Sequence, residues 1–448
     1  MLSIFILLVS LFVTFLNGQS DEESQIWPWP WWGGEEYAYN FLPLGGWNTL
    51  GSLFSKSTAR GETLFAADDS SSGYLNPAFL TSVLTPKLSL SYRYTENTYR
   101  SAFSPQIIPL EFESGGWRNL ETHSFKRKTD YLDSFGLLLP FKNWVLAANY
   151  FLFQEYNFPE IKAPAWFSPE KVAQDGKVKG INFALAYRLT SKFSLGFGAT
   201  YLLGEISRTE KYQPYFWILD EGGVSSLPFR GKNHIIPPWP WPSWWLVEKH
   251  TLNLKGYFFN LGCMIQPSEE LAIGFMLRPP FSLNIEAEIE YLYAELPERN
   301  EIYSGKYYFK HPLCAGASLL YKPVEAFALT ADIFYWGWSQ SSTDFYPDWV
   351  TTNTSLYFKS VARLNLGAEY RFTLPFEKID NLSLRAGYIY DPQPYQSQEA
   401  FSRNYFTAGF GIEICHFAFD AGAKISLSPK ELRRFHQNVF QIGLSYRF

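Results

Sequence analysis

The side chains that could carry catalysis are few and scattered in this 448-residue chain. Its six histidines show neither a zinc-binding spacing nor the context of a nucleophile elbow. His311 and Ser318 are the only His–Ser combination that one wall of a fold could bring together for hydrolysis. The three cysteines, Cys263, Cys314 and Cys415, cannot all pair and lack metal-ligand spacing. We therefore expect no enzyme activity, no cofactor and no metal site.

Charged side chains recur instead at alternate positions of strand-like segments, which places them on one face. The members of this set are Asp332, Arg363, Glu369, Arg371 and Arg385, with Asp420 and Lys424 repeating the pattern nearer the C-terminus. Charges buried inside a fold need partners. Such a cluster could simply satisfy itself in a polar interior, fix an inserted segment, or meet a ligand carboxylate. The sequence leaves these alternatives open.

Aromatic residues share faces with some of these polar ones. Phe334 and Trp336 lie on the face that also carries Thr330 and Asp332, and Phe258 lies on the face of Asn260. If polar residues mark the inside, these three aromatic side chains point inward and could line a path for an apolar molecule. A bulge that flips the register, or packing against an inserted segment, is the alternative.

The elements that position these side chains are strands, because from Lys87 onward apolar residues recur with a period of two. About fourteen segments of roughly ten residues follow one another, an even number that suits a closed membrane barrel. Tight turns such as 142–143 and 191–192 alternate with long polar or aromatic loops, expected especially at about 97–128, 158–178 and 210–250. This alternation is typical of outer-membrane barrels. We expect an all-β fold: a transmembrane antiparallel β-barrel of about 14 strands, surrounded by outer-membrane lipid and spanning residues 85–448.

The segment before the first strand has a different character. Residues 63–80 are rich in small side chains, contain Gly73 and Pro77, and lack a long apolar period. We interpret residues 19–84 as an N-terminal periplasmic segment and a hatch that folds back into the lumen; a surface loop is the alternative. Residues 1–18 predict a signal peptide because a short apolar run precedes small and then acidic residues. An uncleaved anchor is the alternative.

Two Trp-Pro-rich segments, 26–32 and 236–245, could meet lipid headgroups or line an access groove, and the sequence does not decide between these. The net charge of −5 and the dispersed basic residues argue against nucleic acid as a partner. The C-terminal segment 440–448 alternates and ends on Phe448, as the last strand of a bacterial barrel often does.

Three motifs together resemble the FadL family of outer-membrane transporters. They are Ala66-Ala-Asp-Asp69 followed by Asn76-Pro77-Ala78, the strand 327–339 that ends in Trp-Ser, and Leu384-Arg-Ala-Gly-Tyr-Ile-Tyr-Asp391. The chain departs from the family in its long Trp-Pro-rich start and in a reduced glycine content ahead of the hatch motif. The hatch and gate residues expected from the motif are Asp68, Asp69, Asn76, Pro77, Ala78 and Phe79.

The resemblance implies passive uptake of hydrophobic compounds, either long-chain fatty acids or aromatic or aliphatic hydrocarbons, across the bacterial outer membrane. A ligand would reach an apolar pocket from the outer loops and leave when the hatch shifts or through a gap in the wall. We expect a hydrophobic small molecule as ligand and a monomeric protein. The alternative is a non-transporting barrel that serves as a secretion-associated or surface-binding platform.

Overall fold

The computed structural model describes residues 55–66, 69–103, 121–162, 171–212, 246–293, 297–343, 359–376, 379–392, 394, 402–427 and 435–448. All of them belong to one of the chain's two units, Pro43–Phe448. The predicted signal peptide, both Trp-Pro segments and the predicted gate residue Asp68 lie outside the described residues. In the described part of the chain, no helix has the length and apolar character needed to cross a membrane.

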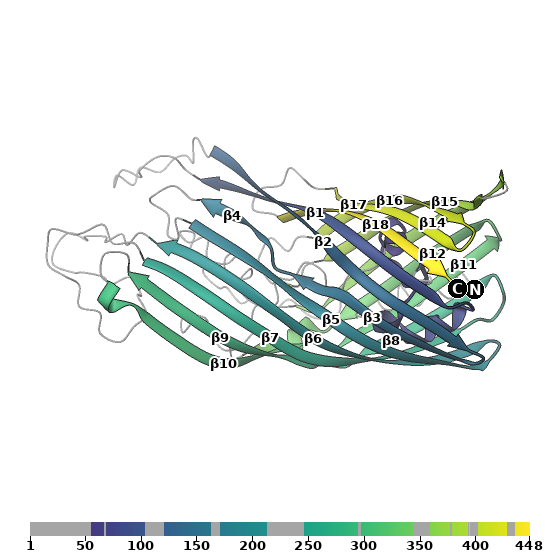
Figure 1. Ribbon diagram of the computed structural model, residues 1–448, viewed down its shortest axis with the longest axis horizontal. Helices are drawn as coiled ribbons and strands as arrows, with labels where there is room; N and C mark the ends of the chain where they lie inside the picture. The colour runs from purple at the N-terminus through teal and green to yellow at the C-terminus, as the bar shows by residue number, and fades with distance from the viewer. Residues whose placement is uncertain are drawn as a thin grey trace, which may run out of the picture. The chain divides into compact units, whose positions relative to one another are not determined.

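The described strands form one closed antiparallel barrel (Figure 1). Ten strands are continuous: β1 Lys87–Phe103, β2 Glu121–Phe141, β5 Lys171–Thr190, β6 Phe193–Tyr212, β7 Leu246–Ile265, β14 Val361–Phe376, β15 Ile379–Pro392, β16 Ser402–Ile414, β17 Phe417–Ser426 and β18 Phe435–Arg447. Four more are each broken once, into β3 Trp144–Glu155 and β4 Phe158–Lys162, β8 Leu271–Arg278 and β9 Phe281–Tyr293, β10 Glu301–His311 and β11 Cys314–Val324, and β12 Phe327–Trp336 and β13 Ser342–Thr343. The eighteen segments therefore make fourteen strands, and β1 closes the ring by pairing with both β2 and β18.

Side chains alternate across the wall, with apolar residues outside near the rim of short turns. In β6, Leu195 and Phe197 are 44% and 46% exposed, whereas their neighbour Ser194 is buried. In β18, Phe440 and Ile442 face outward and Gln441 faces inward. A water-soluble sheet would show the opposite arrangement, so this part of the wall is built to meet lipid.

Several strands are much longer than the sequence pattern predicted. β2 contains 21 residues, and β5 contains 20, although about 9–11 residues suffice to cross a bilayer. The loops predicted at 97–128 and 158–178 were therefore wrong in part, because strands occupy both ends of each. The period-two apolar signal stops where the wall leaves the lipid, while the backbone hydrogen bonds continue beyond it.

The wall is split between β2 and β3 on the side of the long loops. Their ladder runs only between the pairs Ser134–Phe151 and Phe141–Trp144. Beyond it, side chains replace the backbone contact: Glu155 accepts hydrogen bonds from Thr129 and Tyr131, both at 2.9 Å. All seven residues from 151 to 157 are buried, and β3 stays paired with β5 up to Glu155–Lys177 after a register shift between Leu152 and Gln154, so beyond Phe151 this strand is joined by a backbone ladder to β5 and not to β2.

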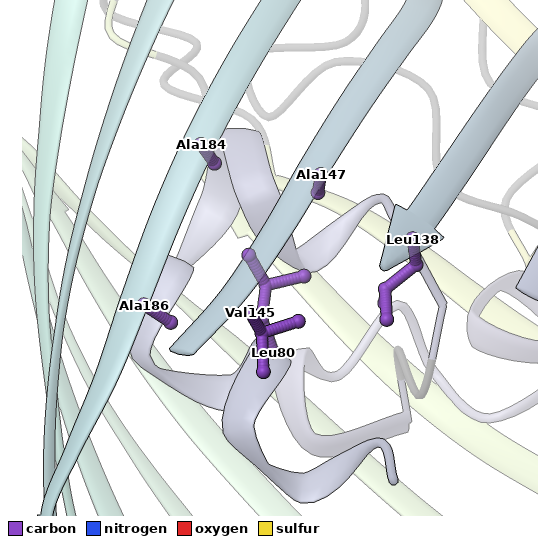
Figure 2. Packing of buried hydrophobic residues seen from close by; sticks show 6 residues of the cluster. All are labelled: Leu80, Leu138, Val145, Ala147, Ala184 and Ala186. Carbon is purple, nitrogen blue, oxygen red and sulfur yellow. The ribbon is translucent and has the colours of Figure 1, made fainter. Parts of the chain in front are cut away.

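Among the described residues, four short helices precede β1 and lie against the inner face of the wall; we refer to this segment, residues 55–82, as the hatch after its predicted position. They are α3 Ser55–Ala59, η1 Leu64–Ala66, α4 Ser72–Leu75 and η2 Pro77–Ser82. Pro77 begins η2, where its missing N–H costs nothing, and the Asn76 side chain accepts a hydrogen bond from the Ala78 amide at 3.2 Å. Figure 2 shows the apolar contact that seats the end of η2, formed by Leu80 with Leu138, Val145, Ala147, Ala184 and Ala186.

Candidate functional site

The hatch is joined to the inner wall by buried ion pairs. Glu62 contacts Arg363 of β14 through a carboxylate–guanidinium pair and accepts a hydrogen bond from Lys424 Nζ of β17 at 2.7 Å. Burial alone would raise the pKa of Glu62, but the two cations outweigh it and hold the pKa at about 2. Glu62 is thus a charged anchor at any ordinary pH.

A second ion-pair group lies beside the first. Arg60 of the hatch contacts Glu369 at 3.3 Å, and Arg385 bridges Glu369 at 2.9 Å and Asp420 at 2.6 Å. Arg371 also reaches Glu369, at 3.2 Å, from a half-exposed position. The charged face predicted on β14 and β15 therefore does meet the hatch.

Of the two acids predicted at the hatch, Asp68 lies outside the described residues. The wall pairs with Arg60 and Glu62, whereas Asp69 accepts hydrogen bonds from the backbone N–H and the hydroxyl of Ser71, at 2.8 Å and 2.5 Å. Asp332, also on the predicted face, accepts a hydrogen bond from the Leu64 amide at 2.6 Å.

The opposite side of the hatch is held through backbone carbonyls. Asn76 Nδ2 donates to the Phe275 carbonyl of β8 at 3.0 Å, so this side chain both caps η2 and contacts the wall. Arg278 donates from Nη2 to the Tyr74 carbonyl at 3.1 Å, and Asn260 donates to the same oxygen. The Tyr74 ring stacks on Phe151 with centroids 3.7 Å apart.

Inward-facing glycines let the hatch lie directly on the wall. A Cβ at Gly196 would fall 2.3 Å from the Ala78 nitrogen, and one at Gly387 would fall 2.4 Å from the Gly61 nitrogen. Atoms this close cannot coexist. Glycines that meet the hatch in this way form the glycine belt: Gly136, Gly196, Gly198, Gly262, Gly274, Gly367, Gly387, Gly409, Gly422 and Gly443. The belt includes residues of β2, β6, β7, β8 and β14–β18, so the hatch fits against most of the circumference.

An aromatic cluster adjoins the hatch on the side of the long loops. The Phe258 ring lies 5.1 Å from Phe281 and 5.6 Å from Phe153, and Phe281 stacks on His311 at 4.5 Å. Phe309 and Trp338 contact the His311 ring in turn. We call Phe153, Phe258, Phe281, Phe309, His311 and Trp338 the aromatic cluster.

Breaks in three neighbouring strands coincide with this cluster. The breaks fall at 279–280 between β8 and β9, at 312–313 between β10 and β11, and at 337–341 between β12 and β13. Two of them contain proline, which cannot donate to a ladder. The side chains at these breaks leave a free volume of only about 10 Å³ between Phe153, Arg278, Phe281, His311, Trp336 and Trp338. This is about the volume of one water, so a ligand must displace side chains to enter.

Beyond the cluster the polarity of the wall reverses. The inner faces of β5–β7 and β9 carry Val178, Leu202, Ile206, Leu252, Leu254, Leu283, Ile285 and Ala287, all buried, and we call this surface the upper wall. The outward neighbours are charged: Lys177, Lys179, Glu205, Lys255, Glu286 and Glu288. Glycines lie between the apolar residues, as in the cross-strand row Val178–Gly204–Leu254–Ile285. A barrel built only as a water channel would have no need of an apolar interior outside the membrane.

The structure places the predicted ligand-path residues at the boundary between hatch and cluster. Phe334 and Trp336 are buried next to each other, with centroids 5.6 Å apart, and Phe258 is buried within the cluster. Phe79 of the predicted gate stacks on Phe65 at 4.0 Å. Sequence reasoning missed Arg60, Glu62, Phe153, Arg278, Phe281 and the whole upper wall. Glu62 lies in the pre-strand segment, where no period reports which residues face the wall.

Comparison with known proteins gives a consistent result. Residues 55–411 match the family model described as outer membrane protein transport protein (OMPP1/FadL/TodX). No curated protein sequence matches. Among solved structures, a FadL homologue of Pseudomonas aeruginosa aligns with a TM-score of 0.59 at 14% identity, covering 89% of this chain and 100% of its own. The Ralstonia pickettii toluene transporter TbuX aligns with a TM-score of 0.58 at 14% identity, covering 89% and 99%. The Pseudomonas putida toluene transporter TodX aligns with a TM-score of 0.57 at 15% identity, covering 89% and 98%.

Proposed function

Because the chain belongs to the OMPP1/FadL/TodX family of outer membrane transport proteins, we propose that it mediates passive uptake of hydrophobic compounds across the bacterial outer membrane. The observation that carries this proposal is the apolar upper wall, which leads from the long-loop rim to the aromatic cluster. Hydrophobic molecules enter a polar, water-filled channel poorly, whereas a continuous apolar surface lowers the barrier to their passage.

In this proposal the hatch is the gate. A ligand moves along the upper wall, displaces side chains of the aromatic cluster and reaches Phe334 and Trp336 beside the hatch. The ion pairs of Glu62 and Arg60 keep one side of the hatch fixed to β14–β17, while the contacts of α4 and η2 to β7 and β8 are hydrogen bonds. Movement of the hatch therefore begins most readily on the side of the aromatic cluster.

The experiment that tests the path is uptake of a fluorescent fatty acid into proteoliposomes by a Phe334→Glu, Trp336→Lys double variant. Two charges in a dry aromatic boundary oppose passage of an apolar ligand, so uptake should be lost. The matched control is Phe334→Leu with Trp336→Leu, which keeps the boundary apolar and should retain uptake. Heat-dependent gel migration establishes that both barrels are folded. Uptake by the charged variant at the rate of the wild type would contradict the path.

We further propose that the ligand leaves sideways, through the split between β2 and β3. The ladder between these strands ends at the Ser134–Phe151 pair, and beyond it Tyr131 and Glu155 supply a side-chain contact. Cysteines at these two positions, in a Cys415→Ser background, can be bridged by a short bismaleimide. The bridge should block uptake and leave ligand binding intact. Uptake that continues after complete bridging would place the exit at the hatch instead.

The alternative role as a surface-binding platform would use the two Trp-Pro segments as its contact patch, and both segments lie outside the described residues. No contact among the described residues favours that role over uptake.

A further inference from the structure

A cavity of about 220 Å³ lies at the rim of short turns, between the end of the hatch and the turn that joins β2 to β3. Its lining residues are Thr81, Val83, Leu84, Pro140, Lys142, Asn143, Val145 and Arg188. It shares Val145 with the apolar contact that seats Leu80 of η2 (Figure 2). Unlike the cavity beside the aromatic cluster, it can admit an organic group without displacement of side chains.

Two cations line this cavity, and no acid is among its lining residues. Lys142 and Arg188 form no ion pair with an acid in the part of the chain that the structure describes. Arg188 donates from Nη2 to the Thr81 carbonyl, which leaves its other side-chain N–H groups without a partner among the described residues. Arg363, by contrast, is paired with Glu62. A cavity lined by one sign of charge favours an anion as its occupant.

Positive charge gathers at this arc of the rim. The β2–β3 turn carries Lys142 and the β5–β6 turn carries Lys192, and neither turn contains an acid. Strand β5 pairs with both β3 and β6, so the two turns are close neighbours along the rim. By contrast, the β7–β8 turn contains Glu269 and Glu270, and the β11–β12 turn contains Glu325. An anionic group at this rim is therefore attracted to the arc that holds the cavity.

The lipid-facing surface at the same turn marks the edge of the bilayer. Phe141 and Trp144 are exposed on the outside of the wall, and the centroids of the Trp144 and Tyr187 rings are 4.2 Å apart. Tryptophan and tyrosine gather at the depth of lipid headgroups. Short turns lie on the periplasmic side in barrels of this class. The cavity is therefore level with the headgroups of the inner leaflet, which in a bacterial outer membrane is made of phospholipids.

We propose that this cavity binds the phosphate group of an anionic phospholipid from the periplasmic leaflet, with Lys142 and Arg188 as its cationic contacts. The acyl chains stay outside the wall, along Phe141 and Trp144, and the headgroup bends over the turn into the cavity. The guanidinium of Arg188 has donors to spare for phosphate oxygens while Nη2 stays on Thr81, and the Lys142 ammonium adds a point charge. The site lies outside the ligand path, so this inference does not depend on the proposed uptake function.

Native mass spectrometry of the purified full-length protein tests the proposal with two probes, dioleoylphosphatidylglycerol and dioleoylglycerol. They have the same acyl chains, and only the first carries a phosphate. The wild type should retain phosphatidylglycerol much more tightly than dioleoylglycerol. Lys142→Gln should weaken phosphatidylglycerol binding roughly threefold, as expected for an exposed charge, and Lys142→Gln with Arg188→Gln should weaken it roughly tenfold or more. Lys322→Gln is the matched control, since Lys322 lies in a turn at the same rim but does not line the cavity, and it should bind as the wild type does.

Equal binding of the two probes by the wild type, or unchanged phosphatidylglycerol binding in the double variant, would overturn the site. If the double variant does not fold, as judged by heat-dependent gel migration, the exposed Lys142→Gln change and the comparison of the two probes still decide. Inorganic phosphate distinguishes a lipid from a free anion. It should not displace the lipid, because it lacks the acyl chains that contact the outside of the wall. Displacement of the lipid by millimolar inorganic phosphate would show that the cavity takes a free anion and would overturn the assignment to a lipid.

Discussion

Two levels of one barrel have opposite polarity. At the hatch level, the inner wall carries glycines, amides and ion-paired charges, while Leu195 and Phe197 face outward to lipid. At the upper wall, Leu254 and Ile285 face inward and Lys255 and Glu286 face outward. The same strands, such as β6 and β7, pass through both levels. Their apolar side chains face outward at the hatch level and inward at the upper wall. The inner surface is thus matched to what it contacts, which is protein backbone at one level and, in our proposal, an apolar ligand at the other.

This difference also separates what fixes the hatch from what admits a ligand. The contacts of the hatch are specific in direction: ion pairs, hydrogen bonds and backbone laid on glycine. Contacts along the upper wall depend only on the apolar area that is buried. Such contacts are non-directional, so they tolerate ligands of varied shape. Changes at the hatch level should therefore alter closure of the barrel, and changes at the upper wall should alter ligand passage.

The largest effect should follow from removal of residues 19–84. The hatch occupies the lumen against the glycine belt, so its deletion should turn a closed barrel into an open one. Planar-bilayer recordings should show steady, large currents for the deletion variant and little current for the full-length protein. Currents that are equal before and after deletion would contradict the assignment of the hatch as a plug.

Introducing one larger side chain into the glycine belt should have the next largest effect. In Gly196→Val the new Cβ would fall 2.3 Å from the Ala78 nitrogen and 2.4 Å from the Pro77 carbonyl carbon, both backbone atoms that cannot turn aside. We expect η2 to be displaced and the barrel to conduct intermittently. Gly337→Ala is the control, because its Cβ meets nothing closer than 3.8 Å, and it should stay closed. A closed Gly196→Val barrel would mean that the hatch does not rest on the belt.

Loss of the Glu62 anchor should have an intermediate effect. Removing one member of a buried ion pair costs about 3–5 kcal/mol, so Glu62→Gln should raise the frequency of opening at neutral pH. Glu205→Gln, an exposed outward position, is the control and should behave as the wild type does. Bilayer recordings at pH 7 measure the opening frequency. Identical frequencies for Glu62→Gln and wild type would show that Glu62 does not hold the hatch closed.

The pH dependence of the same anchor follows from its lowered pKa. The pKa of Glu62 is about 2 in the folded protein against 4.5 in the unfolded reference. Its stabilisation is therefore fully present above about pH 4.5 and is lost as the pH falls toward 2. Conductance of the wild type should stay low from pH 7 to 5 and rise only in strong acid. Opening that begins near pH 6 would point to a different group.

The smallest effect should come from the upper wall. Leu254→Asp places a charge on the inner apolar surface and should slow uptake of a fluorescent fatty acid several-fold without any change in bilayer conductance. Glu286→Lys changes the outer face nearby and should leave both properties unaltered. If Leu254→Asp opened the barrel but did not slow uptake, the division between the two levels would be wrong.

Much of the fold could be predicted because lipid imposes a strict rule on the wall. The period-two pattern of segments such as 193–201 marks the lipid-facing side chains, and the tight turns at 142–143 and 191–192 mark one rim. The rule ends at the edge of the bilayer. Val178, Leu252 and Leu254 were therefore not recognised as an inner surface, since alternation alone does not say which face of an extended strand is buried.

The sequence singled out residues 63–80 by their composition but did not indicate their contacts. The four helices of the hatch have only three to six residues each, too short for a helical period to indicate the wall-facing side. Each contact is instead set by the opposite wall, as when Glu62 meets Arg363 and Lys424. The contacts of Arg278 with Asn260 and Tyr74 were missed for the same reason, because they become visible only when β7, β8 and α4 are brought together.

The most direct test of the uptake path is a structure determined with a bromine-labelled apolar ligand, in which anomalous scattering locates the bromine. We expect a bromine peak inside the barrel, against Phe258 and the upper wall, with the hatch still seated on its glycine belt or displaced at α4. Bromine found only on the lipid-facing surface, with the aromatic cluster unchanged, would contradict passage of apolar ligands along the inside of the barrel.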